Sequence, residues 1–385
     1  MEELFKQAVA RNEAARKTSV PWQPDVPYPQ AYYAYNAAAG QWEAQQPSSH
    51  TSSSSAPSAP PSDLQGGGQT GTSSSPSSSP AGHISKIALY AWNVDFMLPF
   101  AEARMTAALG HLETLISPTL SAAAAAAAAQ TPTGGGRGVV IFLQECTEPD
   151  LLTIAGNPWV RDNFVVTDLD NANWASGYYG TTTLVDRKLA AAAGLAACFR
   201  VHYSKTRMER DVLFVDIDIT AKILRVGNTH LESMALEPAY RPPQVELAAR
   251  YMKGGDGAAG TEADKTVHAA LLAGDFNAVQ EFDRTLHADN GLKDAYIELG
   301  GKEDTQDGYT WGQQAATVLR ERYGCSRMDK VYFHGNGLQL NKFERFGADV
   351  ELQDEEQRRE LVDLGFDKPW ITDHLGVVAE FDIVD

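Results

Sequence analysis

Short apolar runs follow one another from Ile84 onward, and they restrict the fold more than any other feature of the sequence. Runs of this length are typical of β-strands, and they occur at 84–92, 139–144, 211–219, 222–230 and 269–275. The longer mixed segments 98–115 and 239–252 favour helices. Strands interleaved with helices predict an α/β fold in which sheets are buried between helical layers.

Residues 46–81 differ from the rest of the chain because they are almost wholly Ser, Pro, Gly, Ala and Thr. Such a segment cannot bury enough apolar surface to offset the loss of chain entropy. We therefore predict a disordered N-terminal region, residues 1–81, that ends in this flexible linker, and one large domain over residues 82–385. Segments 121–138, with eight consecutive alanines, and 254–264 are expected to be surface loops.

The N-terminal region also contains an aromatic-rich stretch from Trp22 to Trp42. This stretch is a candidate docking site for an unknown protein partner, with disorder or loose adherence to the domain as the alternative. Because the polar clusters described below all lie beyond residue 81, deletion of residues 1–81 is expected to leave activity within a few-fold of that of the full chain.

Charge and cysteine content exclude several classes of protein. The net charge is −18, whereas proteins that coat long duplexes are normally basic, so a broad nucleic-acid footprint is not expected. The charge still permits a grip on one strand end. Three cysteines without a CxxC pair indicate neither a disulfide framework nor a zinc module. No apolar run reaches the length of about 18 residues that a membrane span needs, so a soluble intracellular protein without a membrane partner is expected.

Polar clusters stand where the apolar runs end. Asn93 and Asp95 close the first run and share one face of an extended strand, although a turn-forming pair is the common alternative. Glu145 follows the second run and offers the oxygen ligand that Mg²⁺ prefers, unless it is only a residue emerging at the surface. His230 ends an alternating run, where a structural histidine is the usual alternative.

The most specific cluster is G-D-x-N, which places Asp275 and Asn277 on one strand face, while its glycine permits close backbone packing. Asp329 opens a later apolar run and is a carboxylate capable of orienting a histidine. The pair Asp373 and His374 precedes the final run. A common site at the strand ends is therefore expected.

In chain order the clusters are N-x-D, Q-E, H-x-E-S, G-D-x-N, R-x-D and D-H. This order resembles the DNase I-like endonuclease/exonuclease/phosphatase superfamily over residues 84–385. The resemblance implies a four-layer α/β/β/α sandwich of two mixed sheets and a metal-dependent phosphodiesterase. Within the superfamily, the T-H-L-E-S segment at 229–233, Asp95, and the aromatic residues Tyr178 and Trp311 are similar to features of 5′-tyrosyl-DNA phosphodiesterases.

The resemblance gives each polar residue a role. Glu145 and Asp95 are expected to hold Mg²⁺, with Mn²⁺ as the alternative. The expected catalytic set, in which an aspartate activates water and histidines donate to the phosphate, comprises Asp275, His374, His230, Asn277, Asn93, Asp329 and Asp373. Ser233, Tyr178 and Trp311 are expected to bind substrate, the two aromatic rings by stacking on an unpaired base.

The implied substrate is a DNA 5′ end that carries a tyrosyl-linked protein or peptide, in DNA repair, with a nuclear location and the cytoplasm as the alternative. The nearest alternatives are other hydrolases of the superfamily: an abasic-site endonuclease, a sphingomyelinase or an inositol-phosphate phosphatase. A catalytically silent binding module is the alternative from another class, although every core residue is present. Two departures weaken the expected DNA contact: relatives usually carry Arg at the position of Val279 and an aromatic residue at that of Met328.

Overall fold

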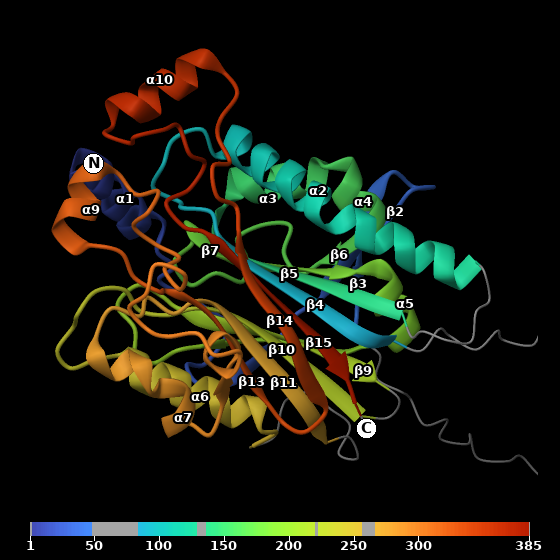
Figure 1. Ribbon diagram of the computed structural model, residues 1–385. Coiled ribbons are helices and arrows are strands. Elements are labelled where there is room, and N and C mark those ends of the chain that lie inside the picture. Colours follow the sequence, from blue (N-terminus) through green and yellow to red (C-terminus); the bar gives the residue numbers. More distant parts are fainter. Residues whose placement is uncertain (1, 48–83, 129–135, 220–221, 256–265, 385) are drawn as a thin grey trace, which may run out of the picture.

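The computed structural model describes residues 2–47, 84–128, 136–219, 222–255 and 266–384, which form two stacked sheets between helical layers (Figure 1). Within these residues the first sheet has seven strands in the order β1 (Pro27–Pro29), β8 (Leu195–His202), β9 (Asp211–Ile219), β10 (Lys222–His230), β11 (Val267–Asp275), β13 (Asp329–His334) and β12 (Lys293–Asp294). No helix of the described residues is long and apolar enough to cross a membrane.

The second sheet lies against the first. Its described strands follow the order β14 (Leu338–Phe346), β15 (Gly376–Ile383), β4 (Ile84–Asn93), β5 (Gly136–Thr147), β7 (Tyr179–Asp186), β6 (Phe164–Val166), β2 (Tyr32–Asn36) and β3 (Gln41–Gln45). Both sheets are mixed, since β4 pairs parallel with β5 and β10 parallel with β11, while the other neighbours are antiparallel.

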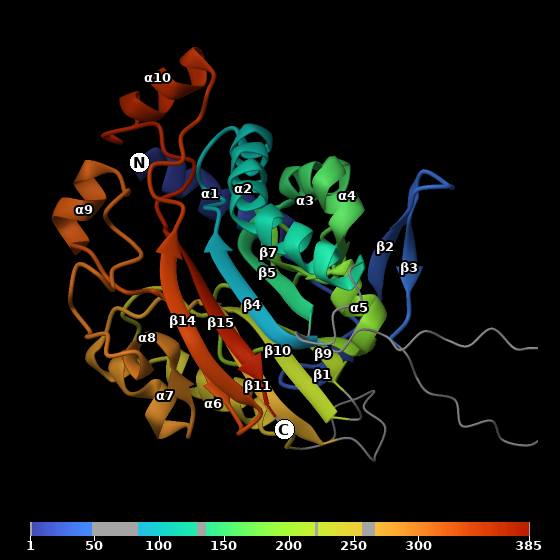
Figure 2. The same cartoon turned by 45° about the vertical axis from the view of Figure 1, so that its right-hand side comes forward.

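Helices cover the two outer faces (Figure 2). The second sheet is covered by α2 (Ala101–Ala128), α3 (Glu148–Gly156) and α4 (Pro158–Asn163), and the first by α6 (Arg241–Met252) and α7 (Leu286–Asp289). The remaining helical segments lie at the edges and in loops: α1 (Glu2–Ala15), α5 (Arg187–Ala193), η1 (Glu281–Arg284), α8 (Ala295–Glu298), α9 (Thr317–Tyr323) and α10 (Glu355–Asp363). The predicted four-layer α/β/β/α sandwich is confirmed.

Strand β4 shows why apolar runs suit this architecture. Its residues Ile87, Leu89 and Ala91 pack between the two sheets, whereas Tyr90 and Trp92 pack beneath the helices. A strand with both faces buried needs apolar residues at every position rather than at alternate ones. The continuous runs of the sequence are thus the central strands of the sandwich.

Parallel pairing brings polar residues to one end of the sandwich. In the second sheet Asn93 lies beside Gln144, and in the first His230 lies beside Asp275. Strand β13 runs antiparallel to β11, so that its first residue, Asp329, also pairs with Asp275. Residues far apart in the sequence therefore meet at the same edge, as the strand-end clusters predict.

The prediction of disorder in the N-terminal region is wrong for the part that the structure describes. Strand β1 pairs with β8 at one edge of the first sheet, and the hairpin β2–β3 pairs with β6 at one edge of the second. Open sheet edges offer unpaired backbone groups, and the aromatic-rich stretch satisfies them. The folded unit therefore begins before residue 82, and residues 48–81 of the predicted linker 46–81 lie outside the described residues.

The loop expected from residue 121 is also wrong in its first part. Helix α2 continues to Ala128, because alanine has the highest helix propensity of the common residues. Residues 129–135 lie outside the described residues, and β5 begins at Gly136. Of the second expected loop, residues 256–264 lie outside them as well.

Candidate active site

Asp275 lies at the centre of the candidate site, at the end of β11. Before it, Gly274 has φ +138°, and a Cβ at this position would lie 1.9 Å from the carbonyl oxygen of Thr229, so the motif requires glycine. Asn93 Nδ2 donates to Asp275 Oδ2 over 2.9 Å, and the backbone N–H of Asn277 donates to Oδ1 over 2.8 Å. Since Asn93 ends a strand of the other sheet, Asp275 is held from both sheets.

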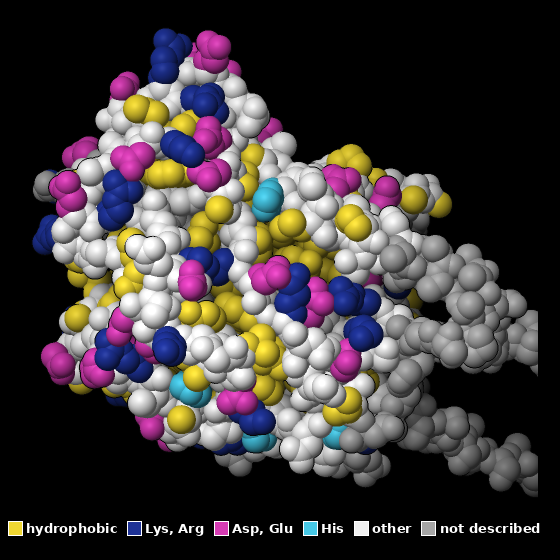
Figure 3. Space-filling view, viewed as in Figure 1, with side chains coloured by type: hydrophobic (Ala, Val, Ile, Leu, Met, Phe, Trp, Pro, Cys, Tyr) yellow, Lys and Arg dark blue, Asp and Glu magenta, His cyan; other side chains and the backbone are white. Residues whose placement is uncertain are grey.

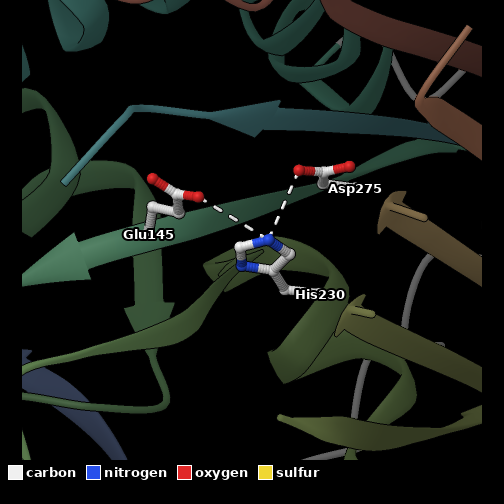
Figure 4. A group of neighbouring side chains, drawn as sticks. All are labelled: Glu145, His230 and Asp275. Carbon is white, nitrogen blue, oxygen red and sulfur yellow. Dashed lines mark ion pairs between the residues drawn. The ribbon is translucent and has the colours of Figure 1, made fainter. Parts of the chain in front are cut away.

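His230 ends β10 and points between two carboxylates (Figure 4). Its Nε2 lies 3.6 Å from Glu145 Oε1 and 3.3 Å from Asp275 Oδ2. Its Nδ1 lies 2.5 Å from Nη1 of Arg210, and a guanidinium can only donate, so Nδ1 accepts and the ring proton is on Nε2. Burial, and then the charge of Arg210, lower the pKa of His230 to about 4. This ring is therefore neutral at pH 7.

His374 lies on the other side of Asp275. Its Nδ1 is 2.8 Å from Asp329 Oδ2, and its Nε2 is 3.7 Å from Asp275 Oδ2. Burial opposes a charged ring, but the two carboxylates outweigh it and raise the pKa of His374 well above its ordinary value. Burial raises the pKa of Asp329 to about 6, which leaves this carboxyl ionised at pH 7. His374 is therefore a cation held by Asp329.

The protonation of Asp275 follows from these neighbours. Burial acts to raise its pKa, but the charge of His374 and the hydrogen bonds from His230 and Asn277 outweigh burial and bring the pKa below the ordinary value. Asp275 is therefore an ionised acceptor at neutral pH. A carboxylate of low pKa is a weak base, so its first contribution to a hydrolysis is the orientation of water.

Glu145, Asp95 and Asp373 form an acidic group beside Asp275. Glu145 lies at a bulge of β5 with φ +59°, and Asp95 has φ +54°, so both adopt the left-handed backbone that is costly for non-glycine residues. Burial, and then the charge of Asp95, raise the pKa values of Glu145 and Asp373, each to about 7. Crowded carboxylates that repel one another fit a divalent cation that takes oxygen ligands, such as Mg²⁺ or Mn²⁺.

Glu145, His230 and Asp275 also offer ligand atoms within 4.8 Å of one another. A metal on Nε2 of His230 would require the ring proton on Nδ1, where Arg210 already donates. Two donors would then face each other. The carboxylates are therefore the better cation site, and the Nε2 proton of His230 points toward the same space.

The structure gives the predicted substrate-binding residues different surroundings. Tyr178 is half-buried, and its ring lies edge-on to Phe96 with centroids 5.9 Å apart. Trp311 is only 9% exposed, and its Nε1 donates to Asp373 Oδ2 over 2.6 Å, so it supports the acidic group and has little surface for a stacked base. Ser233 is half-buried three residues after His230, and the described residues show no hydrogen bond between its side chain and the cluster.

Val279 and Met328, the two positions that depart from the pattern of the relatives, differ in exposure. Val279 is 44% exposed at the rim of the G-D-x-N loop. Met328 is buried and packs with Trp311 and Ala315. An apolar contact therefore replaces the aromatic one at this position, while no cation stands at Val279.

Sequence reasoning missed Arg210. The Arg210 guanidinium lies over the Tyr179 ring at 5.2 Å from its centroid, and this ring stacks on Phe96 at 4.2 Å. The only signal in the sequence was a polar Arg210-Asp211 doublet at the start of a strand. Thr310 was missed too, although its Oγ1 accepts from the backbone N–H groups of Met328 and Asp329 over 3.1 and 2.9 Å.

Carboxylates, amides and two histidines around one aspartate, at the strand ends of a two-sheet sandwich, define a hydrolase of the metal-dependent class. Figure 3 shows one face of the molecule, with acidic and basic side chains interspersed over it. The model of the endonuclease/exonuclease/phosphatase family matches residues 90–374, and the chain belongs to this family. The superfamily that the sequence resembles is thereby confirmed. No curated protein matches the chain by sequence.

Solved structures share the fold. D. rerio TDP2 humanized by 14 mutations and D. rerio TDP2 complexed with single-strand DNA product each give a TM-score of 0.52 at 17% identity, over 77% of this chain and 99% of theirs. Truncated C. elegans TDP2 gives a TM-score of 0.52 at 19% identity, over 77% of this chain and 97% of that one. At these identities the likeness shows the fold.

Proposed function

We propose that the protein is a divalent-metal-dependent phosphodiesterase that hydrolyses the 5′-phosphotyrosyl bond between a DNA end and a trapped protein. One observation carries the chemistry: Asp275, held by Asn93 and Asn277, lies between a neutral and a cationic histidine beside a crowded acidic group. Such a site combines an acceptor for water with donors for phosphate oxygens.

The residues divide the work of an in-line hydrolysis. Asp275 orients the attacking water and accepts its proton, and Asn277 and Asn93 keep the carboxylate in place. His374 donates to the phosphate as negative charge develops, and the Nε2 proton of His230 points to the same region. Glu145, Asp95 and Asp373 would hold the cation, with Asp373 fixed by Trp311. When bound, the cation supplies positive charge to phosphate oxygens and the leaving oxygen.

The choice of substrate rests on the sequence and on the leaving group. The T-H-L-E-S segment and Tyr178 resemble the 5′-tyrosyl-DNA phosphodiesterases, and D. rerio TDP2, which shares the fold, has been crystallised with a single-strand DNA product. A phenol has a pKa of about 10, so a tyrosyl oxygen leaves as an anion more easily than an alkoxide does. DNA repair and a nuclear location belong to the same proposal.

The test is the release of tyrosine from oligonucleotides with a 5′- or a 3′-phosphotyrosyl end, beside strand cleavage of an abasic oligonucleotide, with Mg²⁺, Mn²⁺ or chelator. We expect turnover of the 5′-tyrosyl substrate only with metal. Glu145→Ala should lower kcat by at least about 10³-fold, whereas Glu148→Ala, an exposed carboxylate three residues on, should not. Preference for a 3′-tyrosyl or abasic end would overturn the substrate, and full activity in chelator would overturn the metal.

A further inference from the structure

The N-terminal segment reaches the candidate active site through α1. The end of this helix packs on the loop that carries Tyr178, since a Cβ at Gly177 would lie 2.2 Å from the carbonyl oxygen of Ala15. Lys17 continues the contact, and its Nζ donates to the carbonyl oxygens of Asn171 and Ala172 over 2.5 and 2.7 Å. The helix is therefore bound to the loop that carries Tyr178, which is one of two loops beside His230.

Helix α1 and Arg16, which directly follows it, also contact the second loop, which carries Glu209. Asn12 Nδ2 donates to Glu209 Oε2 over 3.3 Å, and Arg16 Nε lies 2.9 Å from Glu209 Oε1. The Glu209 side chain is 7% exposed, while that of Arg16 is 62% exposed, so the acidic partner is buried beneath the helix. Glu209 also has φ +55°, a backbone conformation that persists in non-glycine residues only where surrounding contacts hold it.

Glu209 directly precedes Arg210, which connects these contacts to the site. Arg210 donates to Nδ1 of His230 and lies over the Tyr179 ring. Tyr179 OH in turn donates to the carbonyl oxygen of Met208 over 3.0 Å, so the two loops are also bound to each other. The direction in which Arg210 leaves the backbone therefore depends on how Glu209 is held.

We propose that Asn12 and Arg16 are positioning residues for the reaction, and that they act through Glu209 to aim Arg210 at His230 and Tyr179. The inference rests on the proposed phosphodiesterase function and deepens it, because it assigns to the N-terminal segment a part in the same site. It replaces the expectation that deletion of residues 1–81 leaves activity within a few-fold. Arg210 determines which nitrogen of His230 carries the proton. A misdirected Arg210 would therefore allow the tautomer with its proton on Nδ1 instead of Nε2.

The experiment uses the full chain and the p-nitrophenyl ester of thymidine 5′-monophosphate with Mg²⁺, so that it does not depend on a protein adduct. We expect the double variant Asn12→Ala/Arg16→Ala to lower kcat about tenfold, in the range that a displaced positioning contact produces, with KM nearly unchanged. The single variant Arg16→Lys should keep most of the wild-type kcat, because lysine keeps the positive charge. Glu13→Ala is the matched control, since Glu13 is exposed on the same helix.

Two further measurements separate positioning from a loss of folding. In a double-mutant cycle, Arg16→Ala and Glu209→Gln should be far from additive, because both remove the same contact. Hydrogen exchange of residues 204–211 should rise in the double variant, while exchange in β4 and β11 stays as in the wild type. Equal kcat and equal exchange in wild type and double variant would overturn the inference.

The outcomes also distinguish this inference from the proposed function. A wild type without turnover of any phosphodiester would defeat the proposed function, and the exchange of residues 204–211 would still decide whether α1 holds the Glu209–Arg210 loop. Turnover in the wild type with unaffected variants and unchanged exchange would defeat the inference alone.

Discussion

The two histidines beside Asp275 are equally buried but differ in charge. His374 faces the carboxylate of Asp329, and its pKa is raised well above the ordinary value. His230 faces the guanidinium of Arg210, and its pKa is lowered to about 4. Burial opposes the charged form of both rings, so burial does not explain the difference. The group at Nδ1 decides whether each ring is a cation or a neutral donor.

The two histidines are therefore expected to have different roles. A cationic ring stabilises the charge that develops on phosphate oxygens, whereas a neutral ring with its proton on Nε2 donates without adding charge. Asp275 lies between them and remains ionised because of both. If both rings were cations or both were neutral, the pKa of Asp275, the carboxylate that orients water, would change. The following predictions change one side of the pair at a time.

The largest effect is expected on the His374 side. His374→Ala should lower kcat by about 10³-fold, because one of the donors that stabilise developing charge is lost. Asp329→Asn should lower kcat by about 10²-fold, and the double variant should be little worse than His374→Ala alone. Steady-state rates at saturating Mg²⁺ measure all three. Additive losses would show that Asp329 and His374 do not act as one unit.

The pH profile tests the same pair independently. The wild type should lose activity at high pH as His374 deprotonates, since the pKa of His374 is raised well above its ordinary value. The neutral amide of the variant Asp329→Asn no longer favours the cation, so the pKa of His374 should fall and the alkaline limb should move to lower pH. A limb that stays in place would assign it to another group.

A smaller effect is expected on the His230 side. Arg210→Met keeps a long side chain but removes the cation, so the pKa of His230 should rise from about 4 toward 6.5. We expect kcat to fall about tenfold, as for a displaced donor. NMR titration of the His230 ring measures the pKa, with the His374 ring as the internal control. A His230 pKa that stays near 4 would show that burial alone neutralises this ring.

The pH dependence of stability should separate the two rings. The lowered pKa of His230 means that the unfolded state binds the proton first, so its contribution to stability is lost as pH falls from about 6.5 to about 4. The raised pKa of His374 gives a contribution that is complete below about 6.5 and lost as pH rises through the folded value. Urea unfolding of metal-free Arg210→Met should therefore show a shallower loss of stability toward pH 4 than the wild type. Equal pH slopes would contradict the assignment.

The smallest effect concerns the rim. Val279 is exposed two residues beyond Asn277, and no cation stands at this position. Val279→Arg should strengthen binding of a 5′-tyrosyl oligonucleotide and change the slope of log(kcat/KM) against log[salt] by nearly one, as one added phosphate contact does. Val279→Gln is the control for side-chain size. An unchanged slope would place this rim away from the DNA.

The strand-end residues could be predicted because apolar runs determine where strands lie. Asn93, Glu145, His230 and Asp275 follow such runs, and parallel pairing of β4 with β5 and of β10 with β11 places the ends of these strands at one edge. Asp329 was predicted, from its place at a strand start, to be capable of orienting a histidine, and the structure joins it to His374. The roles of these residues remain predictions until variants are measured.

The contacts of Arg210, Trp311 and α1 could not be predicted from the sequence. Arg210 meets His230 across twenty positions of sequence, and Trp311 meets Asp373 across 62. Nothing near either residue in the chain records such a partner, and the polar helix α1 shows no apolar pattern that would indicate its contact with the Tyr178 and Glu209 loops.

The sequence by itself determined an α/β fold with buried sheets and the chemical groups of the site, because strand periodicity and polar strand ends are local properties of the chain. Only the tertiary structure decided which histidine is charged, which carboxylates crowd together, and that α1 lies against Glu209. These depend on distances between side chains from different strands and sheets, and electrostatic interactions between buried groups change steeply with such distances.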